Sequence, residues 1–181
     1  MYDANTLEKV DYSGEEPVET TYEYDDIENH YVKPYAEKLA QLDIGLEGKS
    51  LRPDESITKR DYLMLVALAD DNHYEHYTSD LLAKTMIRNG IIESADKNLD
   101  EPVSRMDAVR FMINKLGYKE IAAKTSIFNC PFADIGEDMK GYAALGAALG
   151  IVSDKSEILD AQNNLTRADA LIIIYNYLTR E

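Results

Sequence analysis

A five-residue pattern that occurs three times constrains this chain more than any other feature. It reads Ile-Thr-Lys-Arg-Asp at residues 57–61, Val-Ser-Arg-Met-Asp at 103–107 and Leu-Thr-Arg-Ala-Asp at 165–169. Each copy runs directly into an apolar segment with helical spacing. Thr and Ser are favoured N-caps, and an Asp three residues later can bond back to the amide of the cap. The pattern therefore predicts three capped helices whose leading apolar residues, Ile57, Val103 and Leu165, pack inward.

The basic residue of the pattern, Lys59, Arg105 or Arg167, is not explained by helix stability. A cation in the first turn faces the positive end of the helix dipole, which costs about 0.3–1 kcal/mol at a surface. One interpretation is contact with an anionic ligand, for which a helix N-terminus is a favourable place. Then Arg167→Ala should weaken binding and leave the fold intact. The other interpretation is a bridge to a neighbouring carboxylate, and then the same change should destabilise the fold.

Composition narrows the class of protein. The chain has 181 residues and is 45% hydrophobic, which suits one domain or a few small repeats that share one core. Its formal charge of -15 argues against nucleic acid or an anionic membrane as a partner recognised by overall charge. Without an apolar run long enough to cross a bilayer, we expect no membrane insertion. The first residues lack the basic and apolar regions of a signal peptide.

The sequence contains no recognisable chemistry for catalysis or metal binding. Cys130 is the only cysteine, so an internal disulfide is excluded, and no Cys/His set has zinc-like spacing. The stretch 96–100 begins like a calcium loop, but Glu101 stands where the sharp turn needs Gly. No nucleophile elbow, phosphate loop or paired-carboxylate signature is present. We therefore predict a protein that is not an enzyme and uses no cofactor or metal.

The order of apolar segments predicts an all-α protein made of three helix-loop-helix repeats. In each repeat a helix, over about 31–42, 77–89 or 139–149, precedes a glycine-containing break and then the capped helix. We place the break of the first repeat at 44–48. The predicted boundaries are an acidic tail or linker at 1–23, repeats at 24–70, 71–117 and 132–181, and an insertion at 118–131.

Short motifs in these repeats resemble the S-layer homology (SLH) family. The third repeat matches best, with Phe-Ala-Asp-Ile at 132–135, Gly-Ile-Val at 150–152 and the Leu-Thr-Arg-Ala-Asp pattern. The first repeat has Tyr-Asp-Asp-Ile at 24–27, His-Tyr-Val at 30–32 and Leu-Arg-Pro-Asp at 51–54. The second keeps Gly-Ile-Ile at 90–92 and the Ser-Arg-Met-Asp part of the pattern. The Trp position of the family holds Tyr31 in the first repeat and Met139 in the third.

The resemblance implies three repeats packed with pseudo-threefold symmetry into a three-pronged body. It also implies a location at the bacterial cell surface, cell wall or S-layer, with this module anchoring a surface domain by binding a secondary cell-wall polysaccharide. That polymer is expected to be anionic, with pyruvylated sugars whose carboxylate an Arg can bind. The ligand-binding residues that follow from the motifs are Lys59, Arg60, Asp61, Arg105, Asp107, Arg167, Asp169, Tyr31, Asp26 and Asp134.

Structural roles for the same residues stay open. The three pattern Asp residues can serve as helix caps, Asp26 and Asp134 can cap a helix or fix an interface between repeats, and Tyr31 can belong to the core. The alternative function is an SLH-like module that has lost sugar binding and mediates protein-protein contact or assembly. Wall binding requires basic and aromatic residues that converge in a groove. The alternative requires filled or acidic grooves and an exposed apolar patch elsewhere.

Overall fold

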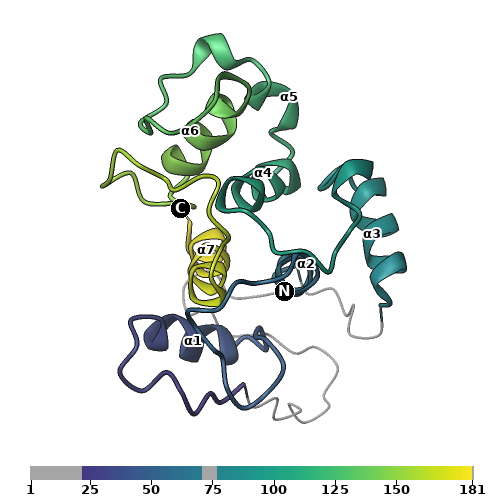
Figure 1. The fold of residues 1–181 in the computed structure, drawn as a ribbon, viewed down its shortest axis with the longest axis vertical. Helices are drawn as coiled ribbons and strands as arrows, with labels where there is room; N and C mark the ends of the chain where they lie inside the picture. The colour runs from purple at the N-terminus through teal and green to yellow at the C-terminus, as the bar shows by residue number, and fades with distance from the viewer. Residues whose placement is uncertain (1–21, 71–76, 181) are drawn as a thin grey trace.

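The structure, a computed structural model, describes residues 22–70 and 77–180, and these residues form helices and no strand (Figure 1). The all-α class predicted from the sequence is confirmed for this part of the chain. The acidic segment predicted at 1–23 lies, except for its last two residues, outside the described residues. The helices are α1 (Lys33–Ala40), α2 (Lys59–Leu68), α3 (Ser79–Arg88), η1 (Ser94–Asp96), α4 (Arg105–Lys115), α5 (Lys119–Ala122), η2 (Thr125–Ile127), η3 (Glu137–Met139), α6 (Lys140–Ala148) and α7 (Arg167–Thr179).

The three leading apolar residues of the repeated pattern form a closed ring of backbone hydrogen bonds. The N–H of Ile57 donates to the carbonyl of Leu165 at 2.9 Å, and the N–H of Val103 donates to that of Ile57 at 3.1 Å. The N–H of Leu165 donates to the carbonyl of Val103 at 2.9 Å and closes the ring. All three residues are fully buried, so their predicted inward position is confirmed. The ring joins the start of α2, α4 and α7.

Each capped helix also receives carbonyl partners from the loop that precedes the next capped helix. The first amides of a helix have no partner within that helix, so a buried helix start needs acceptors from elsewhere. These bonds run from the first repeat to the second, from the second to the third and from the third back to the first. They are Lys59 to Glu101 and Arg60 to Leu99, Arg105 to Asn163 and Met106 to Ala161, and Arg167 to Glu55 and Ala168 to Pro53, all between 2.9 and 3.1 Å.

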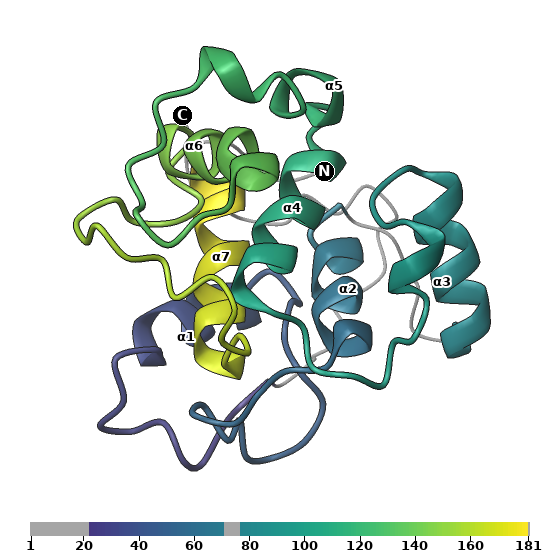
Figure 2. The same ribbon diagram turned by 45° about the horizontal axis from the view of Figure 1, so that its top comes forward.

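The first helix of each repeat packs mainly against the second helix of a different repeat. Helix α1 contacts α7, α3 contacts α2, and α6 contacts α4. Figure 1 shows α2, α4 and α7 near the middle, with α1, α3 and α6 outside them, and Figure 2 shows the same pairs from a second direction. The chain leaves each first helix and passes through the central ring before it starts the next capped helix. The two helices of each packed pair therefore come from different repeats, whereas the predicted helix-loop-helix units pair helices that follow each other in the chain.

Left-handed residues end all three first helices. Gly90 and Gly150 have φ of 72° and 68°, and Asp43 takes the same role in the first repeat with φ of 61°. The next amide bonds back into the helix in each case, as from Ile44 to the carbonyl of Leu39 at 3.0 Å. Asn and Asp tolerate this conformation better than other residues that carry a Cβ. The loop predicted at 44–48 lies outside the helices, and the left-handed residue that ends the first helix, Asp43, directly precedes it.

The capped helices each bury one apolar face, with partial exposure near the C-terminal ends of α4 and α7. The buried residues include Tyr62, Leu65, Val66, Ala69, Val109, Met112, Ile113, Leu171 and Ile174. Leu116, Tyr175 and Leu178 are partly buried against the core. The insertion contains a short helix, α5. Tyr31, by contrast, is 57% exposed and does not belong to the core. Among the described helices, none is long and apolar enough to cross a membrane.

Candidate functional site

The helix starts confirm one half of the predicted capping arrangement. The hydroxyl of Thr58 accepts from the N–H of Asp61 at 3.1 Å, and Thr166 accepts from Asp169 at the same distance. Ser104 makes the equivalent bond at 3.0 Å. The Asp carboxylates, however, bond to cationic or hydroxyl side chains rather than completing a capping box. The caps therefore define each helix start, and the carboxylates of Asp61 and Asp169 connect repeats, whereas Asp107 bonds within its own repeat.

At three junctions between repeats, a basic residue of the pattern pairs with a carboxylate of another repeat, and at two of them this carboxylate is the pattern Asp. At the Arg105 junction, the Arg105 guanidinium forms an ion pair with Asp169. At the Arg167 junction, Nη1 of Arg167 lies 3.5 Å from a carboxylate oxygen of Asp61. The equivalent partner of Lys59 would be Asp107, but Lys59 pairs with Glu101 at 3.3 Å. We name this last place the Lys59 junction.

The Arg167 junction is a buried structural bridge. Arg167 is 6% exposed, and its Nε donates to the carbonyl of Leu51 at 2.5 Å. Its guanidinium thus satisfies a buried backbone acceptor while it faces Asp61. Arg60, a predicted ligand residue, bonds to the hydroxyl of Ser79 at 2.5 Å and to the carbonyl of Tyr77 at 3.4 Å. Arg60 therefore holds the start of α3, and these contacts match the bridging interpretation.

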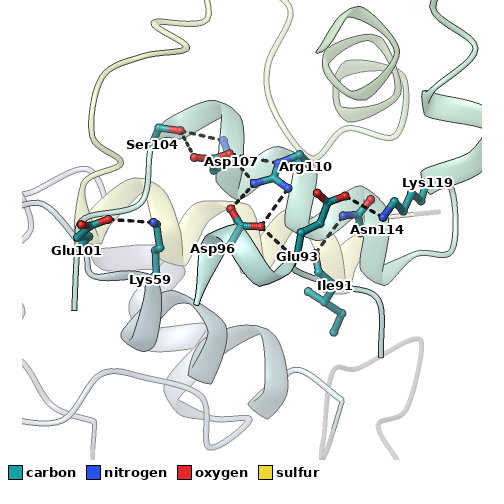
Figure 3. A network of polar contacts seen from close by, with 10 residues as sticks. All are labelled: Lys59, Ile91, Glu93, Asp96, Glu101, Ser104, Asp107, Arg110, Asn114 and Lys119. Atoms are coloured by element: carbon teal, nitrogen blue, oxygen red, sulfur yellow. Dashed lines mark hydrogen bonds and ion pairs between the residues drawn. The ribbon is translucent and has the colours of Figure 1, made fainter. Parts of the chain in front are cut away.

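At the Lys59 junction, Arg110 forms ion pairs with two carboxylates (Figure 3). Its Nη2 lies 2.8 Å from oxygens of both Asp96 and Asp107, and Asp107 also accepts from the hydroxyl of Ser104 at 2.9 Å. Burial alone would raise the pKa of Asp96, but hydrogen bonds from Arg110 and from the N–H of Glu93 outweigh it and lower that pKa. The stretch that begins like a calcium loop is thus part of an ion-pair network.

Sequence reasoning missed Arg110. Its counterparts, three residues after the pattern Asp, are Met64 and Ile172. A charged residue at a position that is apolar in the other repeats is a signal that repeat comparison could have used.

The Arg105 junction presents the exposed ring of Tyr31 beside an ion pair. The hydroxyl of Tyr31 donates to Asp169 at 3.2 Å, and its ring lies 4.2 Å from that of His30 with a 34° tilt. His30 is held in turn, because its Nδ1 accepts from the N–H of Val32 at 3.2 Å and its Nε2 lies 3.4 Å from Asp54. Through Asp169, the exposed ring of Tyr31 is linked to the Arg105–Asp169 ion pair.

Two features of the Arg105 junction bear on its chemistry. Partial burial and the carboxylates of Asp169 and Asp54 raise the pKa of Tyr31, so its phenol stays protonated and donates. The Nε of Arg105 is buried without a hydrogen-bond partner, in contrast to the Nε of Arg167. A buried donor without a partner is costly and favours any rearrangement that supplies an acceptor. The junction thus combines the aromatic ring of Tyr31, two carboxylate acceptors and a guanidinium whose buried Nε has no hydrogen-bond partner.

Asp26 and Asp134 organise loops within their own repeats. The Asp26 carboxylate accepts from the amides of Leu51 at 2.8 Å and Arg52 at 2.7 Å. Asp134 accepts from those of Leu159 and Ala161, both at 2.9 Å. Burial opposes the ionised form of Asp134, but these backbone donors prevail and lower its pKa. Both residues fix the loops that lead into the central ring, and neither caps the first helix.

No group of three or more His, Cys, Asp or Glu side chains in 22–70 and 77–180 is arranged to hold a metal ion. Comparison with models of known protein families gave no match. Comparison with curated proteins gave none either.

Proposed function

We propose that this chain is an SLH-type module that anchors a surface protein to the bacterial cell wall by binding a secondary cell-wall polysaccharide. The observation that carries the proposal is the Arg105 junction, where the exposed ring of Tyr31 adjoins the Arg105–Asp169 ion pair. The proposal includes a pseudo-threefold relationship among the repeats. The ring through Ile57, Val103 and Leu165 supports it, because the same backbone bonds recur at each junction.

The side chains of the junction suit a sugar that carries a carboxylate. Tyr31, whose ring contacts that of His30 at a 34° tilt, offers an apolar face to the C–H groups of a sugar ring. Asp54 and Asp169 can accept from its hydroxyl groups, and Arg105 can donate to a ketal carboxylate. A charge-assisted contact of this kind is worth about 1.5–3 kcal/mol. Because the net charge is -15, an anionic polymer must be attracted by this local guanidinium and not by the overall field.

Binding to purified sacculi, before and after chemical removal of the wall polysaccharide, tests the proposal. Tyr31→Ala should abolish sacculus binding and keep the fold, because Tyr31 is 57% exposed. Tyr118→Ala is the matched control, since Tyr118 is 42% exposed and lies in the insertion. Binding by the unmodified chain that survives removal of the polysaccharide, or equal loss in both variants, would contradict the proposal.

A protein-protein module is the second candidate, and exposed apolar residues in the insertion favour it. Ile121 and Ile127 are 46% and 64% exposed and lie close to Tyr118 in the chain. In addition, the three pattern cations are engaged in ion pairs. This candidate predicts that Tyr31→Ala changes nothing, whereas Ile121→Asp with Ile127→Asp abolishes self-association or partner binding measured by sedimentation. Sacculus binding that depends on Tyr31 would reject it.

A further inference from the structure

We infer that only the Arg105 junction binds a sugar ligand, so that the module carries one binding site although it has three repeats. This inference rests on the function proposed above and specifies its valency. Two features separate the Arg105 junction from both of the others, namely the aromatic residue and the state of the basic residue. A third feature, the state of the pattern Asp, separates it from the Lys59 junction.

Among the described residues, an exposed aromatic ring at this position is found at the Arg105 junction alone, where it is supplied by Tyr31. Tyr31 stands twelve residues before the left-handed Asp43, and the residues twelve before Gly90 and Gly150 are Thr78 and Asp138. Thr78 is the N-cap of α3, where its hydroxyl accepts from the N–H of Leu81 at 3.3 Å. Met139, which the sequence motifs place at the Trp position, falls one residue later and packs against the core. Of these equivalent positions in the part of the chain that the structure describes, only Tyr31 therefore offers a stacking surface to a sugar ring.

The basic residues differ in the donors that they can offer. Arg167 uses Nε on the carbonyl of Leu51 and is 6% exposed. Lys59 has a side chain that is 12% exposed and pairs with Glu101. Arg105 has a side chain that is 25% exposed and retains an Nε without a partner. A ligand carboxylate can thus be accommodated by Arg105 without displacing a backbone acceptor.

At the Lys59 junction, the pattern residue Asp107 is bonded to other side chains of the protein and is not available to a ligand. Arg110 and the hydroxyl of Ser104 both bond to Asp107, and Arg110 is itself fixed by Asp96. The corresponding Asp169 bonds to Arg105 and to Tyr31, an exposed side chain that a ligand can contact. Arg110 therefore closes the Lys59 junction with an internal ion-pair network.

One site per chain has a consequence for attachment to a repeating polymer. A module with several sites gains affinity because the second contact is intramolecular, and a module with one site lacks this gain. The affinity of the isolated chain for a long polymer should therefore equal its affinity for a single pyruvylated sugar, apart from the number of sugars offered. Strong anchoring would then need several chains side by side.

Calorimetric titration with a methyl glycoside of a pyruvylated N-acetylhexosamine measures the valency. We expect about one site per chain, and we expect Tyr31→Ala to remove it completely. Two or three sites, or residual binding in Tyr31→Ala, would overturn the inference and leave wall anchoring in place. If the unmodified chain binds neither this glycoside nor sacculi, the proposed function fails, and the inference fails with it.

A variant designed to gain a second sugar site tests why the Lys59 junction does not bind. We combine three changes at the Lys59 junction. Lys59→Arg supplies a guanidinium, Arg110→Met removes the cation that pairs with Asp107, and Asp138→Tyr adds the aromatic ring. The stoichiometry of this variant should rise to about two, and should return to about one when Tyr31→Ala is added. Thermal melting of both variants establishes that they are folded. A folded variant that remains at one site would overturn the assignment of closure to these residues, while the Tyr31→Ala titration tests the single site independently of it.

Discussion

The guanidinium of Arg105 pairs with the carboxylate of Asp169, although the two residues stand in the first turns of different helices. Asp169 lies where a negative charge suits the dipole of α7, and Arg105 lies where a positive charge opposes the dipole of α4. The ion pair offsets the unfavourable interaction between Arg105 and the dipole of α4. The same argument applies to Arg167 and Asp61, which lie 3.5 Å apart. Cations that look unfavourable within one helix are thus explained by the contact between repeats.

Arg167→Ala should destabilise the fold by about 2–3 kcal/mol, because it leaves the carbonyl of Leu51 and the carboxylate of Asp61 without a buried donor. This reverses the expectation from the ligand-binding interpretation, in which the fold stays intact. Urea denaturation measures the change. Arg88→Ala is the control, because Arg88 is exposed at the end of α3 and should matter little. Equal midpoints for the two variants would show that the bridge contributes nothing.

Thr166→Ala should cost about 1 kcal/mol, the usual loss for a capping hydroxyl, because the N–H of Asp169 loses its acceptor. Thr166→Asp should be nearly neutral, since a carboxylate also caps a helix well. Denaturant midpoints for both variants test the assignment. The cap interpretation would have to be abandoned if alanine were as stable as threonine at this position.

Acid should weaken the Lys59 junction. Because the folded-state pKa of Asp96 lies below the ordinary value of an aspartate, the unfolded chain binds the proton more tightly. The stability that Asp96 contributes is therefore fully present above the unfolded-state pKa and is lost as the pH falls through the folded-state pKa. Asp96→Asn should lower stability at pH 6 and flatten its decline below pH 4. A decline as steep as that of the unmodified chain would argue against this ion-pair network.

Gly141→Ala should destabilise the contact between α5 and α6 by about 1–3 kcal/mol. A Cβ on Gly141 would overlap the carbonyl group of Ala122, which belongs to α5. In an unobstructed helix interior the same change is favourable by about 1 kcal/mol. The sign of the change in thermal midpoint therefore reports whether the insertion packs against α6 as described, and a raised midpoint would refute that packing.

The candidate site was only partly accessible to sequence reasoning. Arg105, Asp169 and Tyr31 were all among the predicted ligand residues, and the structure brings these three together. It places Asp26 and Asp134 in separate loops, where their oxygens bind backbone amides. Repeated motifs mark positions that matter, but a motif cannot distinguish a residue that builds the frame from one that contacts a ligand.

Features that depend on a few neighbouring residues could be predicted from the amino-acid sequence. The caps at Thr58, Ser104 and Thr166 each bond to an amide three residues ahead, so chain-local chemistry is sufficient to predict them. The glycine ends at Gly90 and Gly150 follow from backbone geometry in the same way.

The distant group that each charged or aromatic residue contacts depends instead on the tertiary fold. Arg105 and Asp169 are 64 residues apart in the chain, and Arg167 and Leu51 are 116 apart. Contacts over such separations are set by how the ring through Ile57 orders the three repeats, and each first helix packs on another repeat as a result. Burial and partners are properties of that arrangement, and for this reason Tyr31 was exposed where a helical pattern alone would have buried it.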